Sequence, residues 1–212
     1  MGPENPAGGA MALLIDLDGV IRYWDSPPVG TVEATYGLPP GAITATAFAA
    51  GLLEEAILGR ITDEAWRQAI VERLATRYHP QAAREAVRAW SAPCGRVDPG
   101  VLALVRAVRQ MAPVCLVTNA TTRLDHDLEQ LGIRHEFDAV ISSARVGAGK
   151  PDPRIFHAAL AAVDTPAARA LFVDDTAGHV AAAQALGLHG HHFTARIHLE
   201  TALQRAGLLP TP

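Results

Sequence analysis

The segment Leu14-Ile15-Asp16-Leu17-Asp18-Gly19-Val20 is the end of an apolar run that stops at two acidic residues. Short apolar runs that end in polar residues recur along the chain and predict strands buried on both faces. These runs are residues 11–15 before Asp16, 114–117 before Thr118, 139–141 before Ser142, 170–173 before Asp174, and a weaker one at 188–193. The sequence therefore predicts about five strands.

Segments with helical periodicity lie between these runs. They are residues 99–110, 121–131, 153–163 and 177–186. Asp98 before Pro99 is typical of a helix start, and Gly132 and Gly187 are typical of helix ends. Strands that alternate with helices predict an α/β fold, a doubly wound Rossmann-like parallel sheet with right-handed crossovers.

Residues 25–93 interrupt this alternation. Helical patterns fill 42–58, 62–78 and 81–90, and the segment contains no convincing strand. We expect a small helical cap inserted after the first strand, over the carboxyl edge of the sheet. The expected division is a disordered tail at 1–10, a core at 11–24 and 94–212, and a cap at 25–93.

Composition narrows the possible partners and compartment. With 49% hydrophobic residues, 19% charged residues and a net charge of −4, the chain lacks the basic excess of a nucleic-acid-binding protein. Its cysteines, Cys94 and Cys115, are too few for a secreted disulfide framework. No apolar run approaches the ~18 residues of a membrane span, and residues 1–10 do not resemble a signal peptide. We expect a cytoplasmic protein without nucleic-acid or membrane partners.

Polar residues follow the apolar runs directly. Because the carboxyl ends of parallel strands border the ligand crevice of an open sheet, four segments should meet at one site. The residues concerned are Asp16 and Asp18, Thr118 and Asn119, Lys150, and Asp174 and Asp175.

The residue types suit phosphoryl transfer. Several carboxylates can hold Mg²⁺, which prefers oxygen ligands. One carboxylate can attack phosphorus to form an aspartyl-phosphate, and a second can protonate the leaving oxygen and later activate water. Thr118, a backbone amide near Asn119, and Lys150 would stabilise the charged phosphate oxygens.

Four motifs in this order resemble those of the haloacid dehalogenase-like hydrolase superfamily, from Met11 to about Phe193. The motifs are Asp16-Leu17-Asp18-Gly19-Val20, Val117-Thr118-Asn119, Lys150-Pro151-Asp152 and Phe172-Val173-Asp174-Asp175-Thr176. Each motif is weak alone, but the ordered set is specific.

The resemblance implies roles for individual residues. Asp16 would be the nucleophile and Asp18 the general acid/base. Mg²⁺ would be bound by Asp16, the main-chain carbonyl of Asp18 and Asp175, with Asp174 as a direct or supporting ligand. It also implies a mobile helical cap and a small phosphomonoester substrate, as in sugar-phosphate and phosphoglycolate phosphatases; the sequence identifies neither the substrate nor the oligomeric state.

Three other functions compete with the phosphatase. A 2-haloacid dehalogenase resembles the phosphatases but lacks the second acid, so Asp18 favours phosphate. A sugar phosphomutase shares all four motifs and differs in its cap. A phosphoryl-accepting receiver module places its acidic pair first in the chain, whereas Asp174 and Asp175 come last among the motifs here.

Several other side chains suggest secondary hypotheses. His189, His191 and His192 could form a metal site, but such a trio is more often a solvated edge or loop. His179 stands where related phosphatases often have Asn. Arg22 could bind a second anionic group, although such an arginine is more often a solvated surface residue. Core packing is the expected role of two cap tryptophans, Trp66 and Trp90.

Overall fold

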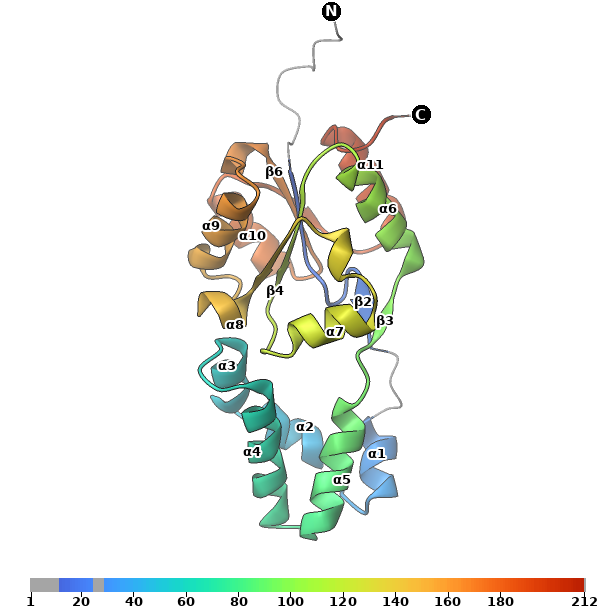
Figure 1. Cartoon of the computed structure of the whole chain (residues 1–212), viewed down its shortest axis with the longest axis vertical. Coiled ribbons are helices and arrows are strands. Elements are labelled where there is room, and N and C mark those ends of the chain that lie inside the picture. Colours follow the sequence, from blue (N-terminus) through green and yellow to red (C-terminus); the bar gives the residue numbers. More distant parts are fainter. Residues whose placement is uncertain (1–11, 25–28, 212) are drawn as a thin grey trace, which may run out of the picture.

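The computed structural model describes residues 12–24 and 29–211, and within them the predicted parallel sheet is confirmed. Its spatial order is β5-β4-β1-β6-β7, and every neighbouring pair is parallel. The strands are β1 (Ala12–Ile15), β4 (Val114–Thr118), β5 (Ala139–Ser142), β6 (Ala170–Asp174) and β7 (His189–His192). The apolar runs are buried because helices cover both faces of the sheet (Figure 1).

Two hydrophobic clusters lie on opposite faces of the sheet. One face packs against α6 (Pro99–Arg109), α7 (Leu124–Gln130) and α11 (Arg196–Arg205). The other packs against α9 (Pro153–Ala162) and α10 (Ala177–Ala185), where Phe156 meets Phe172 edge to face at 5.1 Å between ring centres. Shorter elements are α8 (Ser143–Val146) and the 3₁₀ turns η1 (Arg134–Glu136) and η2 (Ala167–Arg169). The result is a three-layer core.

Five helices between β1 and α6 enclose a third hydrophobic cluster of their own (Figure 1). They are α1 (Val29–Thr35), α2 (Ala42–Ala47), α3 (Leu52–Ile57), α4 (Asp63–Ala75) and α5 (Pro80–Ser91). We refer to residues 29–91 as the helical segment. A short antiparallel ribbon of β2 (Arg22–Tyr23) and β3 (Arg96–Val97) joins the core where the chain leaves and re-enters it.

Several boundaries differ from the expectation. The predicted helix at 42–58 is two helices, because Gly51 adopts a left-handed conformation between them, with φ of 83°. The helix predicted at 121–131 begins only at Leu124. Helices α1, α8 and α11 were not predicted. The expected tail at 1–10 and the start of the expected cap at 25–28 lie outside the described residues.

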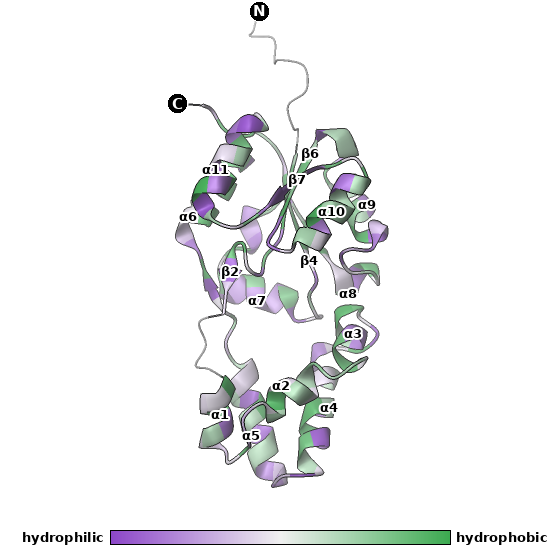
Figure 2. Cartoon of the chain, turned by 180° about the vertical axis from the view of Figure 1, so that it is seen from behind, coloured by the Kyte–Doolittle hydropathy of each residue, from purple (hydrophilic) through white to green (hydrophobic). Residues whose placement is uncertain are grey.

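The edge strand β7 contains the histidine trio and is hydrophilic (Figure 2). His189 Nε2 donates to the Ala168 carbonyl oxygen in η2 at 3.0 Å, and His192 Nε2 donates to the Asp175 carbonyl oxygen at 2.9 Å. No cluster suitable for a metal ion includes these histidines among the described residues. His189 and His192 are exposed, as a solvated edge predicts, whereas His191 is half-buried and its Nε2 has no hydrogen-bond partner in the described part of the chain. Within residues 12–24 and 29–211, the structure contains no helix that combines the length and the hydrophobicity of a membrane span.

Candidate active site

Asp16 directly follows β1 at the carboxyl edge of the sheet, and its side chain is buried. Its Oδ1 accepts a hydrogen bond from the Leu17 amide at 2.7 Å and lies 2.7 Å from Lys150 Nζ. Burial raises the pKa of the Asp16 carboxyl, and the nearby Asp174 carboxylate raises it further, whereas Lys150 opposes the shift. The carboxylate therefore depends on neighbouring positive charge to remain ionised.

Lys150 joins two carboxylates. Its buried Nζ donates to Asp174 Oδ2 at 2.7 Å while pairing with Asp16. The Asn119 side chain holds the Lys150 backbone from both sides, accepting from its N–H at 2.7 Å and donating to its carbonyl at 2.9 Å. Asn119 thus positions the lysine with its side chain, a role that the sequence alone did not suggest.

Asp174 ends β6 and is fully buried. The Thr176 amide donates to its Oδ1 at 2.8 Å, and His179 Nδ1 lies 3.1 Å from the same oxygen. Burial alone would raise the pKa of Asp174, but the bonds from His179 and Lys150 lower it below its ordinary value. His179, which stands where related phosphatases often have Asn, thus supplies a hydrogen bond to Asp174.

Carboxylate oxygens of three residues can converge on one point. Ligand atoms of Asp16, Asp174 and Asp175 all lie within 4.8 Å of one another. Gly19 packs directly on Asp175: a Cβ on Gly19 would lie 2.0 Å from Asp175 Oδ2, and its φ is 77°. Only glycine allows this approach of the turn after β1 to the acidic pair.

Thr118 is the last residue of β4 and is almost fully buried. The four predicted segments therefore meet at the carboxyl edge of the sheet. They follow or end β1, β4 and β6, or lie in the loop before α9.

Asp18 stands apart from the three converging carboxylates and is held by the β2 ribbon. Arg22 donates to both of its carboxylate oxygens, at 2.7 and 2.8 Å, and Trp24 Nε1 donates to Oδ1 at 2.9 Å. Arg22 is buried and also donates to Asp127 Oδ2 at 3.1 Å. The expectation that Arg22 is a solvated surface residue is therefore wrong, because two carboxylates compensate its burial.

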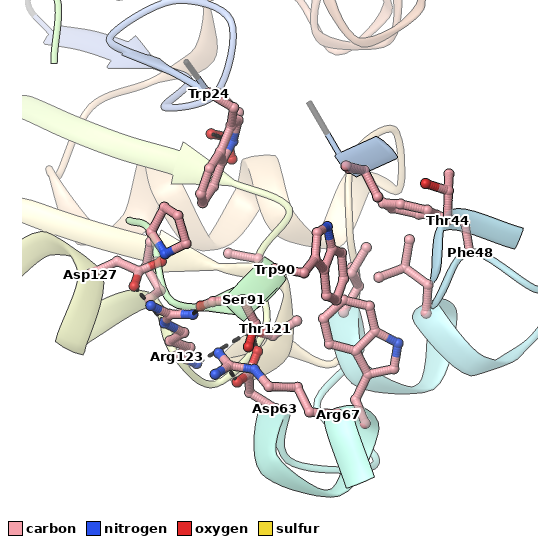
Figure 3. Close-up of a pocket in the computed structure, with 18 of the residues that line it drawn as sticks. Trp24, Thr44, Phe48, Asp63, Arg67, Trp90, Ser91, Thr121, Arg123 and Asp127 are labelled. Carbon is pink, nitrogen blue, oxygen red and sulfur yellow. Dashed lines mark hydrogen bonds and ion pairs between the residues drawn. The ribbon is translucent and has the colours of Figure 1, made fainter. Parts of the chain in front are cut away.

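A charge network behind Asp18 was missed from the sequence. Arg123 pairs with Asp127 at 2.7 Å, and Arg67 pairs with Asp63 (Figure 3). Thr121 Oγ1 donates to Asp63 Oδ1 at 2.8 Å, so that the start of α4 contacts the loop after β4. The available signal was the i,i+4 spacing of the two acid–arginine pairs, 63/67 and 123/127, which is usually a feature of exposed helix faces.

The helical segment makes further contacts with the core. Ser143 Oγ donates to the Ile57 carbonyl at 2.7 Å. Gly59, with φ of 69°, lies so close to α8 that a Cβ would be 2.1 Å from the Ala144 carbonyl oxygen. Arg123 also donates to the Ser91 carbonyl at the end of α5. The helices are thus closed over the carboxyl edge of the sheet.

Relatives with known names share parts of this chain. A sesquiterpene phosphatase, astK, of Aspergillus oryzae is 36% identical over 103 residues, which are 48% of this chain and 53% of the relative. The pyrimidine 5′-nucleotidase YjjG of Escherichia coli is 38% identical over 81 residues, 37% of this chain and 36% of the relative. The chain thus spans about half or less of the length of these relatives.

Solved structures share the fold over most of the chain. An enzyme of Bacteroides thetaiotaomicron in complex with magnesium and inorganic phosphate superposes with a TM-score of 0.72 at 21% identity, covering 88% of this chain and 96% of that one. An L-2-haloacid dehalogenase of Xanthobacter autotrophicus gives a TM-score of 0.60 at 19% identity, covering 95% and 85%. The family model described as haloacid dehalogenase-like hydrolase matches residues 10–187, and the chain belongs to this family of hydrolases.

Proposed function

We propose that this hydrolase is a magnesium-dependent phosphatase that cleaves small phosphomonoesters through an aspartyl-phosphate. The observation that carries the proposal is the arrangement around Asp16, a buried carboxylate that shares Lys150 with Asp174 and can approach Asp175 within 4.8 Å. A nucleophile, a fixed cation and further oxygen donors are the groups that phosphoryl transfer requires.

The donor set fits a hard divalent cation. Asp16, Asp174 and Asp175 offer only oxygen atoms, as Mg²⁺ prefers, and no soft ligand lies in the cluster. Asp16 and Asp175 would hold the ion together with the Asp18 main-chain carbonyl, and Asp174 would support it. When bound, the ion would neutralise phosphate charge and orient the ester beside Asp16.

The proposed hydrolysis proceeds through two successive displacements at phosphorus. In the first, an Asp16 oxygen bonds to phosphorus while the bond to the leaving oxygen breaks, and Asp18 donates a proton to that oxygen. In the second, Asp18 accepts a proton from water as the water oxygen bonds to phosphorus, and the Asp16–phosphorus bond breaks to release phosphate. Lys150, Thr118 and the backbone amide near Asn119 stabilise the phosphate oxygens in both steps.

We further propose that residues 25–93 form a cap over a core at 11–24 and 94–212. The separate hydrophobic cluster of the helical segment supports this division. Such a cap would exclude water from the reacting phosphate and select the leaving group.

The test is phosphate release by the purified protein from p-nitrophenyl phosphate and a phosphometabolite panel, with Mg²⁺ and with chelator. We expect turnover only with the metal, and loss of at least a thousandfold in kcat for Asp16→Asn. Asp125→Asn, the same change at a side chain that is 45% exposed, is the matched control and should retain activity.

Other products would identify the alternatives. Halide release from 2-haloacids without phosphate release would indicate a dehalogenase, and a trapped bisphosphorylated sugar would indicate a mutase. Full turnover by Asp16→Asn would refute the nucleophile.

A further inference from the structure

A large cavity lies between the helical segment and the carboxyl edge of the sheet. Its volume is about 600 Å³, within the range of small-molecule sites. Asp18 and Asn119, two of the residues assigned to phosphoryl transfer, line it on the core side. Phe48 and Trp90 line it on the helical side (Figure 3). Its contents are therefore expected to include the leaving group of the ester.

Apolar side chains dominate the wall contributed by the helices. Those that line the cavity are Val29, Val32, Phe48, Leu53, Ile57, Trp66, Ala89 and Trp90. Trp66 and Trp90 pack edge to face at 5.7 Å, and Trp66 Nε1 is already bonded to the Ala47 carbonyl. The two rings thus pack in the core of the helical segment, as the sequence predicted, and also present apolar surface to the cavity.

The charged side chains in the wall are already committed to one another. Arg22 pairs with Asp18 and Asp127, Arg123 with Asp127, and Arg67 with Asp63. Among the described residues that line the cavity, each arginine therefore has a carboxylate partner. A second phosphate or a carboxylate on the substrate would compete with these carboxylates for the arginines, although Arg67 Nε has no hydrogen-bond partner of its own within residues 12–24 and 29–211.

We propose that the leaving group is a bulky, uncharged alcohol with an alkyl or aromatic body, rather than a sugar or an amino acid. This inference rests on the proposed phosphatase function. Apolar walls gain free energy by removing hydrocarbon from water, whereas the hydroxyls of a polyol would lose hydrogen bonds to water without replacement. The apolar wall favours the first kind of substrate, and the balanced charges disfavour an additional anion.

The test compares phosphomonoesters of primary alcohols, whose leaving oxygens are chemically alike. Ethyl, hexyl and 2-phenylethyl phosphate are compared with glycerol 3-phosphate and erythritol 4-phosphate by kcat/KM. Burial of one methylene corresponds to roughly a fourfold gain. We expect kcat/KM for hexyl phosphate to exceed that for ethyl phosphate by at least tenfold, and the polyol esters to fall below hexyl phosphate by at least as much.

A pair of variants assigns this preference to the cavity. Phe48 lines the cavity and is 56% exposed, so Phe48→Ser removes apolar wall at little cost to folding. Met111 is 58% exposed and lies outside the cavity lining, which makes Met111→Ser the matched control. The hexyl-to-ethyl ratio should fall at least threefold in Phe48→Ser and stay unchanged in Met111→Ser.

Binding provides a readout that does not need turnover. All three tryptophans of the chain, Trp24, Trp66 and Trp90, line this one cavity, so intrinsic fluorescence reports its occupancy. Hexanol should shift the emission saturably, and glycerol should not. Phosphate release that favours the polyol esters, or an equal response to both alcohols, would overturn the apolar leaving group while leaving the phosphatase intact. Absence of phosphate release from every ester would overturn the phosphatase, and the substrate assignment with it.

Discussion

Replacement of Arg22 by methionine should destabilise the protein by about 3 kcal/mol. The Arg22 side chain is 4% exposed and bridges Asp18 and Asp127. Removing one partner of a buried ion pair typically costs about 3–5 kcal/mol. The lower end applies here, because Asp127 keeps its bond to Arg123 and the Asp18 side chain, at 38% exposure, can be hydrated. Methionine preserves most of the apolar stem, so the loss is mainly electrostatic.

Urea or thermal unfolding measures this effect. For a chain of this length, 3 kcal/mol corresponds to a fall of about 6–12 °C in Tm. Arg60→Met is the matched control, since Arg60 is 57% exposed and its pair with Glu55 should contribute about 0–1 kcal/mol. Equal losses in the two variants would refute the view that the Arg22 network is a compensated buried cluster.

Kinetics provide an independent consequence of the same substitution. If Arg22 positions Asp18 for proton transfer, Arg22→Met should lower kcat for alkyl phosphates by about 10²-fold or more, as expected for loss of general acid catalysis. p-Nitrophenyl phosphate releases a stable anion and needs little proton donation, so its kcat should fall much less. A uniform fall for both esters would indicate a purely structural role for Arg22.

Two further substitutions test the contact with the core and the buried sheet. In urea unfolding, Gly59→Ala should destabilise the protein by at least about 1 kcal/mol more than Gly51→Ala. Both glycines have a left-handed φ, but only a Cβ at position 59 would clash with a backbone oxygen, that of Ala144. Equal losses would show that α8 can move away without cost. Burial raises the pKa of the Cys115 thiol from 9.0 in the unfolded chain to about 12 in the folded protein. The neutral thiol therefore contributes its full stability below about pH 9, and this contribution is lost as the pH rises toward 12. Between pH 7 and pH 10 the wild type should lose roughly 1–2 kcal/mol more than Cys115→Ala in chemical unfolding, and parallel pH profiles would contradict the buried neutral thiol.

The sheet and the carboxylates at its edge could be predicted because their signals are local. An apolar run of four or five residues indicates a buried strand. The acidic residue that follows or closes the run, Asp16 or Asp174, indicates where the strand ends. Parallel pairing then brings those ends to one edge without further information. The break at Gly51 was missed because a helix tolerates a single glycine. The sequence pattern alone does not show that this glycine adopts a positive φ and ends the helix.

The arginine network could not be predicted in the same way, because it depends on pairs far apart in the chain. Arg22 meets Asp127 across 105 positions, and Asp63 meets Thr121 across 58. From their spacing in the sequence, such charged residues are expected on solvated helix faces. Their side chains are buried only by the contact between the helical segment and the carboxyl edge of the sheet.

This difference has a chemical consequence for the two acids of the first motif. Asp16 is positioned by its own strand, by the adjacent Leu17 amide and by Lys150, so its role can be inferred from the core alone. Asp18 is positioned by Arg22 and Trp24, which also line the cavity for the leaving group. A ligand in that cavity would therefore contact the same side chains that orient Asp18, the proposed proton donor. Substrate choice and proton transfer should thus vary together when residues of the cavity wall are exchanged, whereas attack by Asp16 should be far less sensitive.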